Sequence, residues 1–451
     1  MNRWSKLART VAPLLLVLFA TACASTYPTR EISEKQSALN RSATAVDESK
    51  LLSVRIETFD PGKLPEDPEQ AKGLSTEIRS AEAYYFPTQL RHTMERSGHW
   101  GPVRVVPKGT RDGEVIVTGR IIESDGEALK LEIAVRDASG VDWFKKEYSG
   151  VVNEEMQNKA QQQNVDAFQF VYNEIANDIA AYNMKISVAD ATQIRRVAAL
   201  RFGADMAPAT YGKYLTDKAG AKPKTEPDAL QQLVSFLDTG ADKPERQPRY
   251  EIKGLPPKGD PLVQRVERIR GREEFLIDTL DQQYDGLARN ISGPYQQWRR
   301  ARLKEINAVR EAERLKQKKQ GEALAIGILG ALAGAAVSSN SNCYGCQTAG
   351  VVIAGTAIAI AAQKAVQASE QAEAETRLRT TAMKELGESL ANDVKPVVVE
   401  VEGKTVELKG TVEQKFQQWK NILDELRARE IGLPPEAPAE KKTGASTGAT
   451  P

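Results

Sequence analysis

The chain has 451 residues, of which 62 are lysine or arginine and 61 are aspartate or glutamate, giving a formal net charge of +1. This balance argues against nucleic acid as a partner, because phosphate binding requires clustered positive charge. With 41% hydrophobic, 27% charged and 6% aromatic residues, the composition favours a helix-rich protein over an all-β one, and the elements described below predict an α+β fold.

The first 22 residues have the order of a secretory signal peptide. Three basic residues precede a short apolar stretch from Val11 to Phe19, and small residues then lead into Cys23. The apolar stretch is too short to span a bilayer as a helix. The alternative is an ordinary secretion signal that is cleaved near Ala22.

The ending Ala-Thr-Ala-Cys resembles the lipobox of bacterial lipoprotein precursors, although Ala20 stands where leucine is usual. The resemblance implies that Cys23 is the lipid attachment site and carries several acyl chains, palmitate among them. Because Ala24 follows the cysteine, the family's sorting rule implies lipid anchoring to the periplasmic side of the outer membrane. Residues 23–50 are rich in serine and threonine without a hydrophobic period, which predicts a flexible lipidated tether.

Residues 51–150 have the pattern of a small α/β module with the element order β-α-β-β-β-β. A helix is predicted over 75–97, with Ser75 as its cap and a kink or split at Pro87. Hairpin turns are predicted at Asp125-Gly126 and Ser139-Gly140. The predicted strands are Leu51–Phe59, Val103–Val106, Glu114–Ile122, Leu129–Val135 and Val141–Tyr148.

This order and the run YYFPTQL…VRVV…VIVTGRI resemble the periplasmic modules of the curli-secretion lipoprotein and of the penicillin-binding-protein activator lipoproteins. The resemblance implies a module that binds an envelope partner and catalyses no reaction. His92 and His99 have no third ligand at metal-binding spacing, so no metal site is predicted.

Residues 151–218 are predicted to be helical, with a glutamine-rich helix from Asn153 to Met184 and another from Ala189 to Phe202. Seven prolines within 219–262 then predict an extended linker and a domain boundary, with one short helix in DALQQLVSFLDTG.

Helical spacing of apolar residues resumes over 263–320, with a break expected at Gly293-Pro294. The last part of this segment is strongly basic, and Tyr295 and Trp298 lie just upstream. A basic helix beside aromatic residues favours contact with anionic lipid head groups, and a merely solvated helix face is the alternative. The residues predicted to make this contact are Arg299, Arg300, Lys316, Lys318 and Lys319.

The glycine-rich segment 321–366 has no charged residue in the 41 positions between Glu322 and Lys364. Its two apolar arms, Ala323–Val337 and Ala349–Ala362, predict a helical hairpin whose small residues allow close helix approach. This pattern resembles the glycine-zipper segments of envelope lipoproteins. The residues predicted for membrane contact or self-association are Gly327, Gly330, Gly334, Gly350 and Gly355.

An arm of this length reaches about 22 Å as a helix, short of the roughly 30 Å hydrocarbon core. We therefore expect a hairpin buried in one membrane or packed against copies of itself, with a hairpin inside a soluble bundle as the alternative. Cys343 and Cys346, at the tip, predict a structural disulfide in an exported protein, within one chain or between two.

Residues 367–430 predict a helix over Thr376–Asn392, a β-hairpin over Val397–Val412 and a helix over Phe416–Arg429. The order and the phrase EVEGKTVELKGTV resemble half of a BON module, which implies phospholipid or envelope binding. Residues 431–451 predict a disordered tail.

No catalytic residues and no cofactor are predicted. The letters Gly444-Ala-Ser446-Thr-Gly448 match a nucleophile elbow, but they lie in the tail with no strand before them. The leading interpretation is a non-enzymatic outer-membrane lipoprotein that binds an unidentified envelope partner and contacts membrane lipid or itself through the hairpin. A subunit of an oligomeric secretion or pore-forming assembly and an activator of a cell-wall synthase remain open.

Overall fold

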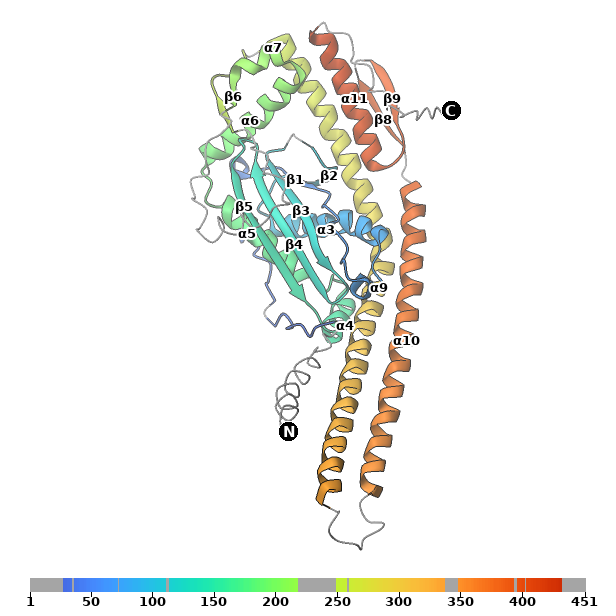
Figure 1. The fold of residues 1–451 in the computed structure, drawn as a ribbon. Coiled ribbons are helices and arrows are strands. Elements are labelled where there is room, and N and C mark those ends of the chain that lie inside the picture. Colours follow the sequence, from blue (N-terminus) through green and yellow to red (C-terminus); the bar gives the residue numbers. More distant parts are fainter. Residues whose placement is uncertain are drawn as a thin grey trace, which may run out of the picture.

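The computed structural model describes residues 27–34, 36–71, 73–110, 113–217, 249–257, 259–336, 348–392, 396–401 and 403–431. The predicted α+β class is confirmed. A mixed five-stranded sheet and its covering helices form a body, and two long helices run side by side along this body and continue beyond it (Figure 1).

The sheet has the strand order β2-β1-β3-β4-β5. Strand β1 is parallel to β2 and β3, and β3, β4 and β5 form an antiparallel meander. The predicted element order and both hairpin turns are confirmed, with Gly126 and Gly140 at the positive φ angles of 94° and 84° that suit glycine. The strands are β1 (Val54–Glu57), β2 (Val103–Val106), β3 (Val115–Ser124), β4 (Ala128–Asp137) and β5 (Asp142–Val151).

Helix α3 (Thr76–Ser97) begins as predicted, with the Ser75 hydroxyl accepting from the Ile78 N–H. The expected split at Pro87 is wrong, because the helix continues through it. Proline leaves the carbonyl four residues earlier without its helical donor. Here the Ala83 carbonyl accepts instead from the Phe59 N–H at 2.8 Å, so tertiary structure replaces the lost bond.

The glutamine-rich helix predicted as one element is two, α4 (Glu154–Gln162) and α5 (Gln169–Asn183). Between them Asn164 has a positive φ of 52°, and the Asp166 carboxylate accepts from the Phe168 N–H. Helix α6 (Val188–Met206) follows, with Ser187 and Asp190 forming a capping box. The short elements of this half are η1 (Glu48–Lys50), α2 (Pro68–Ala71), α7 (Pro208–Tyr211) and η2 (Gly212–Tyr214).

The ends of the proline-rich segment are joined by a two-stranded antiparallel sheet, β6 (Leu215–Asp217) with β7 (Tyr250–Ile252). The short helix predicted in DALQQLVSFLDTG lies outside the described residues. Leu215 and Ile252 pack against the buried cores, so both ends of this segment are held at one place on the body.

Helix α9 (Pro261–Ala336) is a single element of 76 residues, and the expected break at Pro294 is wrong. The residues around this proline are held by packing, since Ile291, Tyr295 and Trp298 are at most 1% exposed. Helix α10 (Thr348–Asn392) has 45 residues and lies against α9, so the two predicted helical arms are the ends of longer helices (Figure 1).

The C-terminal part packs on the upper end of α9. Strands β8 (Val397–Val401) and β9 (Lys404–Leu408) form the predicted hairpin, and α11 (Val412–Ile431) follows. A buried cluster joins Trp419 of α11 to Leu276 and Leu280 of α9 and to Phe202 of α6. Helix α9 also contributes Tyr295 and Trp298 to the core under the sheet, and it therefore connects both halves of the body.

Candidate functional site

The segment before β1 is hydrogen-bonded to the body. Ser33 exchanges bonds with the Val151 backbone, Asn173 donates to the Ser37 carbonyl, and Arg195 donates to the Ser49 carbonyl at 2.5 Å. The prediction of a flexible tether is therefore wrong from Tyr27 onward. Its partners lie far away in the chain, where local composition gives no sign of them.

The N-terminal clamp, as we name it, consists of Tyr27, Arg30, Glu127, Arg302 and Arg310. The Arg310 guanidinium donates to the Tyr27 carbonyl at 3.0 Å, and also to the next carbonyl along the chain at 2.6 Å. The same guanidinium forms a two-point bond to the Glu127 carboxylate at 2.5 and 2.7 Å. One side chain of α9 thus binds both the N-terminal segment and the turn between β3 and β4.

Arg302, about two helical turns before Arg310 on α9, is fully buried. Its Nη2 donates to the Tyr27 hydroxyl at 2.8 Å, its Nη1 lies 2.9 Å from the Glu305 carboxylate, and its guanidinium stacks on the Tyr27 ring at 5.0 Å. Burial raises the pKa of the Tyr27 phenol, so the ring stays a neutral partner. Tyr27 itself is 6% exposed.

Arg30 completes the clamp on the side of the β3–β4 turn. Its guanidinium lies 2.5 Å from Glu123, 2.6 Å from Asp125 and 3.0 Å from Glu127. Three carboxylates surround this one partly buried arginine, and the Arg310 guanidinium adds a second positive charge at Glu127. The clamp therefore fixes the first described residues to the turn and to α9 together.

Arg299 is predicted to contact lipid head groups, and this prediction is wrong. The side chain is 3% exposed and makes a two-point bond to Asp166 at 3.0–3.1 Å. Tyr85 donates to the same carboxylate at 2.9 Å, and the Phe168 and Tyr295 rings face the guanidinium. A buried arginine needs such a partner, and it is supplied here from 133 positions away in the sequence.

Tyr295 and Trp298, expected beside the lipid surface, are also buried in the core. The Tyr295 hydroxyl donates at 2.6 Å to Glu82, whose carboxyl pKa is raised by burial against the opposing effect of Arg79. The Trp298 indole donates to the Gly73 carbonyl at 3.1 Å and to Thr380 of α10 at 3.2 Å. These aromatic residues join α9 to the body.

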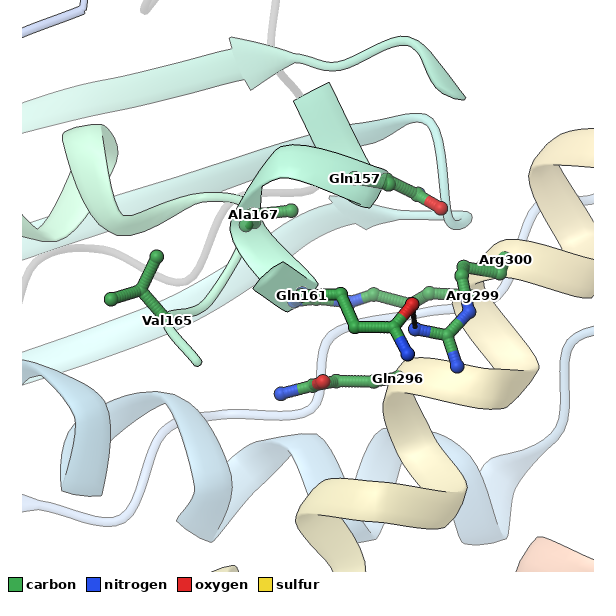
Figure 2. A pocket seen from close by; sticks show the side chains of 8 residues that line it. Gln157, Gln161, Val165, Ala167, Gln296, Arg299 and Arg300 are labelled. Carbon is green, nitrogen blue, oxygen red and sulfur yellow. Dashed lines mark hydrogen bonds between the residues drawn. The ribbon is translucent and has the colours of Figure 1, made fainter. Parts of the chain in front are cut away.

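Figure 2 shows a shallow depression between α4 and α9, with an empty volume of about 260 Å³ that includes open solvent. Arg300, a predicted head-group residue, lies at its rim and donates to Gln161 at 2.8 Å. The Arg299 charge beneath is neutralised by Asp166. The depression is lined by residues among which there is no acid, histidine, serine, threonine or cysteine: Gln157, Ala160, Gln161, Val165, Ala167, Gln296, Arg299 and Arg300.

Helix α9 leaves the body after Arg310. Beyond this point Arg314, Lys316 and Lys318 are exposed, as head-group contact requires. Lys319 and the small residues predicted for membrane contact or self-association lie on the projecting parts of the two helices. On α9 these small residues are Gly327, Gly330 and Gly334, and on α10 they are Gly350 and Gly355.

The two helices are antiparallel in the region where their contacts are described. Arg379 of α10 donates to Gln297 of α9 at 2.9 Å, whereas Thr376, earlier in α10, and Arg302, later in α9, both lie beside Gly73 (Figure 1). Cys23, Cys343 and Cys346 lie outside the described residues. Within the described ranges, no helix is long and apolar enough to cross a membrane, and no cluster of three metal-ligating side chains occurs.

No protein-family model matches this chain, and no curated protein or solved structure matches it either. Sequence reasoning placed Arg302 and Arg310 within one basic surface and missed Tyr27 and Arg30 altogether. The density of arginine on one helix was the signal in the sequence that pointed to this site. It could not identify the partner of Arg310, because Tyr27 lies 283 positions away.

Proposed function

We propose that this chain is a non-enzymatic, lipid-anchored protein of the bacterial outer membrane that faces the periplasm and binds an envelope partner. The far end of the α9/α10 pair contacts membrane or further copies of the chain. Cys23 is the attachment site, and neither a cofactor nor a catalytic residue takes part. The observation that carries this proposal is the projecting pair, which continues as helix through a sequence without charge.

A helix in water is stable when one face is buried and the opposite face is polar. The arm Ala323–Ala336 has no charged residue to form a polar face, and it lies beyond the part of α9 that packs on the body. Lipid or a second protein surface supplies the apolar surroundings that this composition favours. Exposed Lys316 and Lys318, just before the arm, suit anionic head groups.

A subunit of an oligomeric secretion or pore-forming assembly is the second candidate. The same arms favour it, because glycine at i and i+4, as at Gly330 and Gly334, lets helices of neighbouring copies approach closely.

The test compares two substitutions that add the same charge at two places on α9. Full-length mature protein carrying Cys23→Ser, which cannot be acylated, is floated with vesicles of phosphatidylethanolamine and phosphatidylglycerol. Leu332→Glu puts a carboxylate into the arm and is expected to weaken binding roughly 100-fold, since a charge in the membrane interior costs about 3 kcal/mol. Gln317→Glu, at an exposed position before the arm, is the matched control and weakens binding far less.

Sedimentation velocity of the same proteins without vesicles separates the two candidates. A stable oligomer that Leu332→Glu dissociates supports the assembly. Equal flotation of both variants together with a monomer in solution contradicts the proposed role of the arms.

A further inference from the structure

The described chain begins at the end of the body from which the helical pair projects. Tyr27 is bound by Arg302 and Arg310, the latter at the point where α9 leaves the body. Nearby, Asn307 of α9 donates to Glu154 of α4, three residues before Arg310. In Figure 1 the pair extends from this α4 end, away from the end that carries α7 and α11.

The chain between the proposed lipid attachment site and the clamp is short. Cys23 precedes Tyr27 by four positions, so even a fully extended chain spans at most about 14 Å. Such a tether cannot pass around the body. A bilayer that holds the acyl chains of Cys23 must therefore lie beyond the α4 end, on the side toward which α9 projects.

The projecting part of α9 is much longer than this tether. From Arg310 to Ala336 the helix extends about 39 Å at 1.5 Å per residue. The clamp fixes Tyr27 beside Arg310, so the tether and the projecting helix are measured from nearly the same point. The tether keeps the bilayer surface within about 14 Å of this point, and the helix extends about 39 Å from it. The end of the helix therefore reaches the bilayer wherever the tether allows the body to lie.

We infer that the acyl anchor and the projecting end of the α9/α10 pair enter one and the same bilayer, with the N-terminal clamp setting the height of the body above it. This inference rests on the proposed function and commits the arms to the anchoring membrane rather than to an opposite one. It identifies the clamp as the device that couples the two membrane contacts.

The charges along the pair agree with this geometry. A distance of about 14 Å from Arg310 corresponds to about nine residues of helix, which brings the membrane surface to Lys316–Gln320. Continuing the pairing of Arg379 with Gln297 places Lys364, the first charged residue of α10 after the neutral stretch, at about the level of Ala312. The last charged residue of α9, Glu322, thus lies within one helical turn below the expected surface, and Lys364 lies about 10 Å above it. Both helices are uncharged beyond these two residues.

The test uses the acylated full chain with Cys343→Ser and Cys346→Ser, and a fluorescent label on one new cysteine. Ala331→Cys places the label in the arm, and Gln317→Cys places it at the expected surface as the matched control. Each protein is reconstituted either into vesicles that contain nitroxide lipids, which quench the label on contact, or into plain vesicles that are then mixed with separate nitroxide vesicles.

The expected result is a loss of most of the Ala331→Cys fluorescence in the first arrangement, a smaller loss for Gln317→Cys, and no loss for either in the second. Quenching of Ala331→Cys only by the separately added vesicles overturns the inference while leaving the proposed function intact, since the arms then reach an opposite membrane. An unquenched label in both arrangements overturns the inference and the proposed membrane contact together.

Discussion

Helix α9 has two regions that differ in their surroundings, a body half up to Arg310 and a projecting half from Glu311 to Ala336. In the body half, Leu276, Ile277 and Leu280 are fully buried, and even charged side chains such as Arg302 are out of solvent. In the projecting half the Arg314 side chain is 75% exposed and pairs within its own helix, with Glu311. One continuous helix therefore serves as core element and as extension.

The difference teaches how to interpret a basic stretch. Nine basic residues between Arg299 and Lys319 suggested a single surface. In the body half, Arg299 and Arg310 pair across the fold with Asp166 and Glu127. In the projecting half, Arg314, Lys316 and Lys318 are exposed. A charge that is compensated inside the fold adds little to the attraction of a membrane.

The largest effect is expected when the buried half loses a charge. Arg299→Leu leaves the Asp166 carboxylate buried without its cation, and the free energy of unfolding is expected to fall by about 3–5 kcal/mol. Arg314→Leu removes the same charge from the projecting half and is expected to cost less than about 0.5 kcal/mol. Urea unfolding followed by circular dichroism measures both, and similar losses would contradict the division of α9 into two regions.

A smaller effect is expected where the β3–β4 turn touches the body half. A Cβ at Gly126 would lie 2.9 Å from the Arg302 Cβ and 3.0 Å from the Arg299 carbonyl oxygen, at a φ of 94°. Gly126→Ala is therefore expected to lower the free energy of unfolding by about 2–3 kcal/mol, from backbone strain and the displaced helix together.

Gly109→Ala is the control for this substitution. Gly109 has a φ of 77° but no atom within 4 Å of an added Cβ, so its variant reports backbone strain alone, about 1 kcal/mol. Thermal unfolding measures both variants. If Gly126→Ala and Gly109→Ala lower the free energy of unfolding equally, the β3–β4 turn does not pack against α9 as the structure indicates.

Local signals predicted the elements of the N-terminal module well. The strand predicted over Val103–Val106 is β2 with the same bounds, and Gly126 and Gly140 mark the turns as predicted. The errors came where distant groups replace what the local sequence lacks. Pro87 and Pro294 do not end their helices, because the Ala83 carbonyl finds the Phe59 N–H and the residues around Pro294 are held in the core.

The candidate site was less predictable than the fold. The uncharged arms are visible in composition, and their helical backbone follows from their spacing. The clamp is not visible, because Tyr27 and Arg310 are separated by 283 positions and neither residue type is unusual in its surroundings. A Ser- and Thr-rich composition indicates a flexible tether only where no distant part of the fold forms hydrogen bonds with the segment's backbone. Here the folded body forms such bonds.

The smallest of these effects concerns a carboxylate in the body half and depends on pH. Asp281 accepts from the Val105 N–H at 2.7 Å and lies 3.3 Å from Arg91, but burial raises the pKa of its carboxyl to about 6. Because the folded state binds this proton more tightly than the unfolded chain, whose aspartate pKa is near 3.8, the contribution of Asp281 to stability falls as the pH rises from about 4 to 6. Asp281→Asn keeps an acceptor for Val105 and removes the titration. The free energy of unfolding of the wild type relative to this variant is expected to drop by about 2 kcal/mol between pH 4 and 7, and parallel profiles of the two proteins would show that this carboxylate is already charged in the folded helix at low pH.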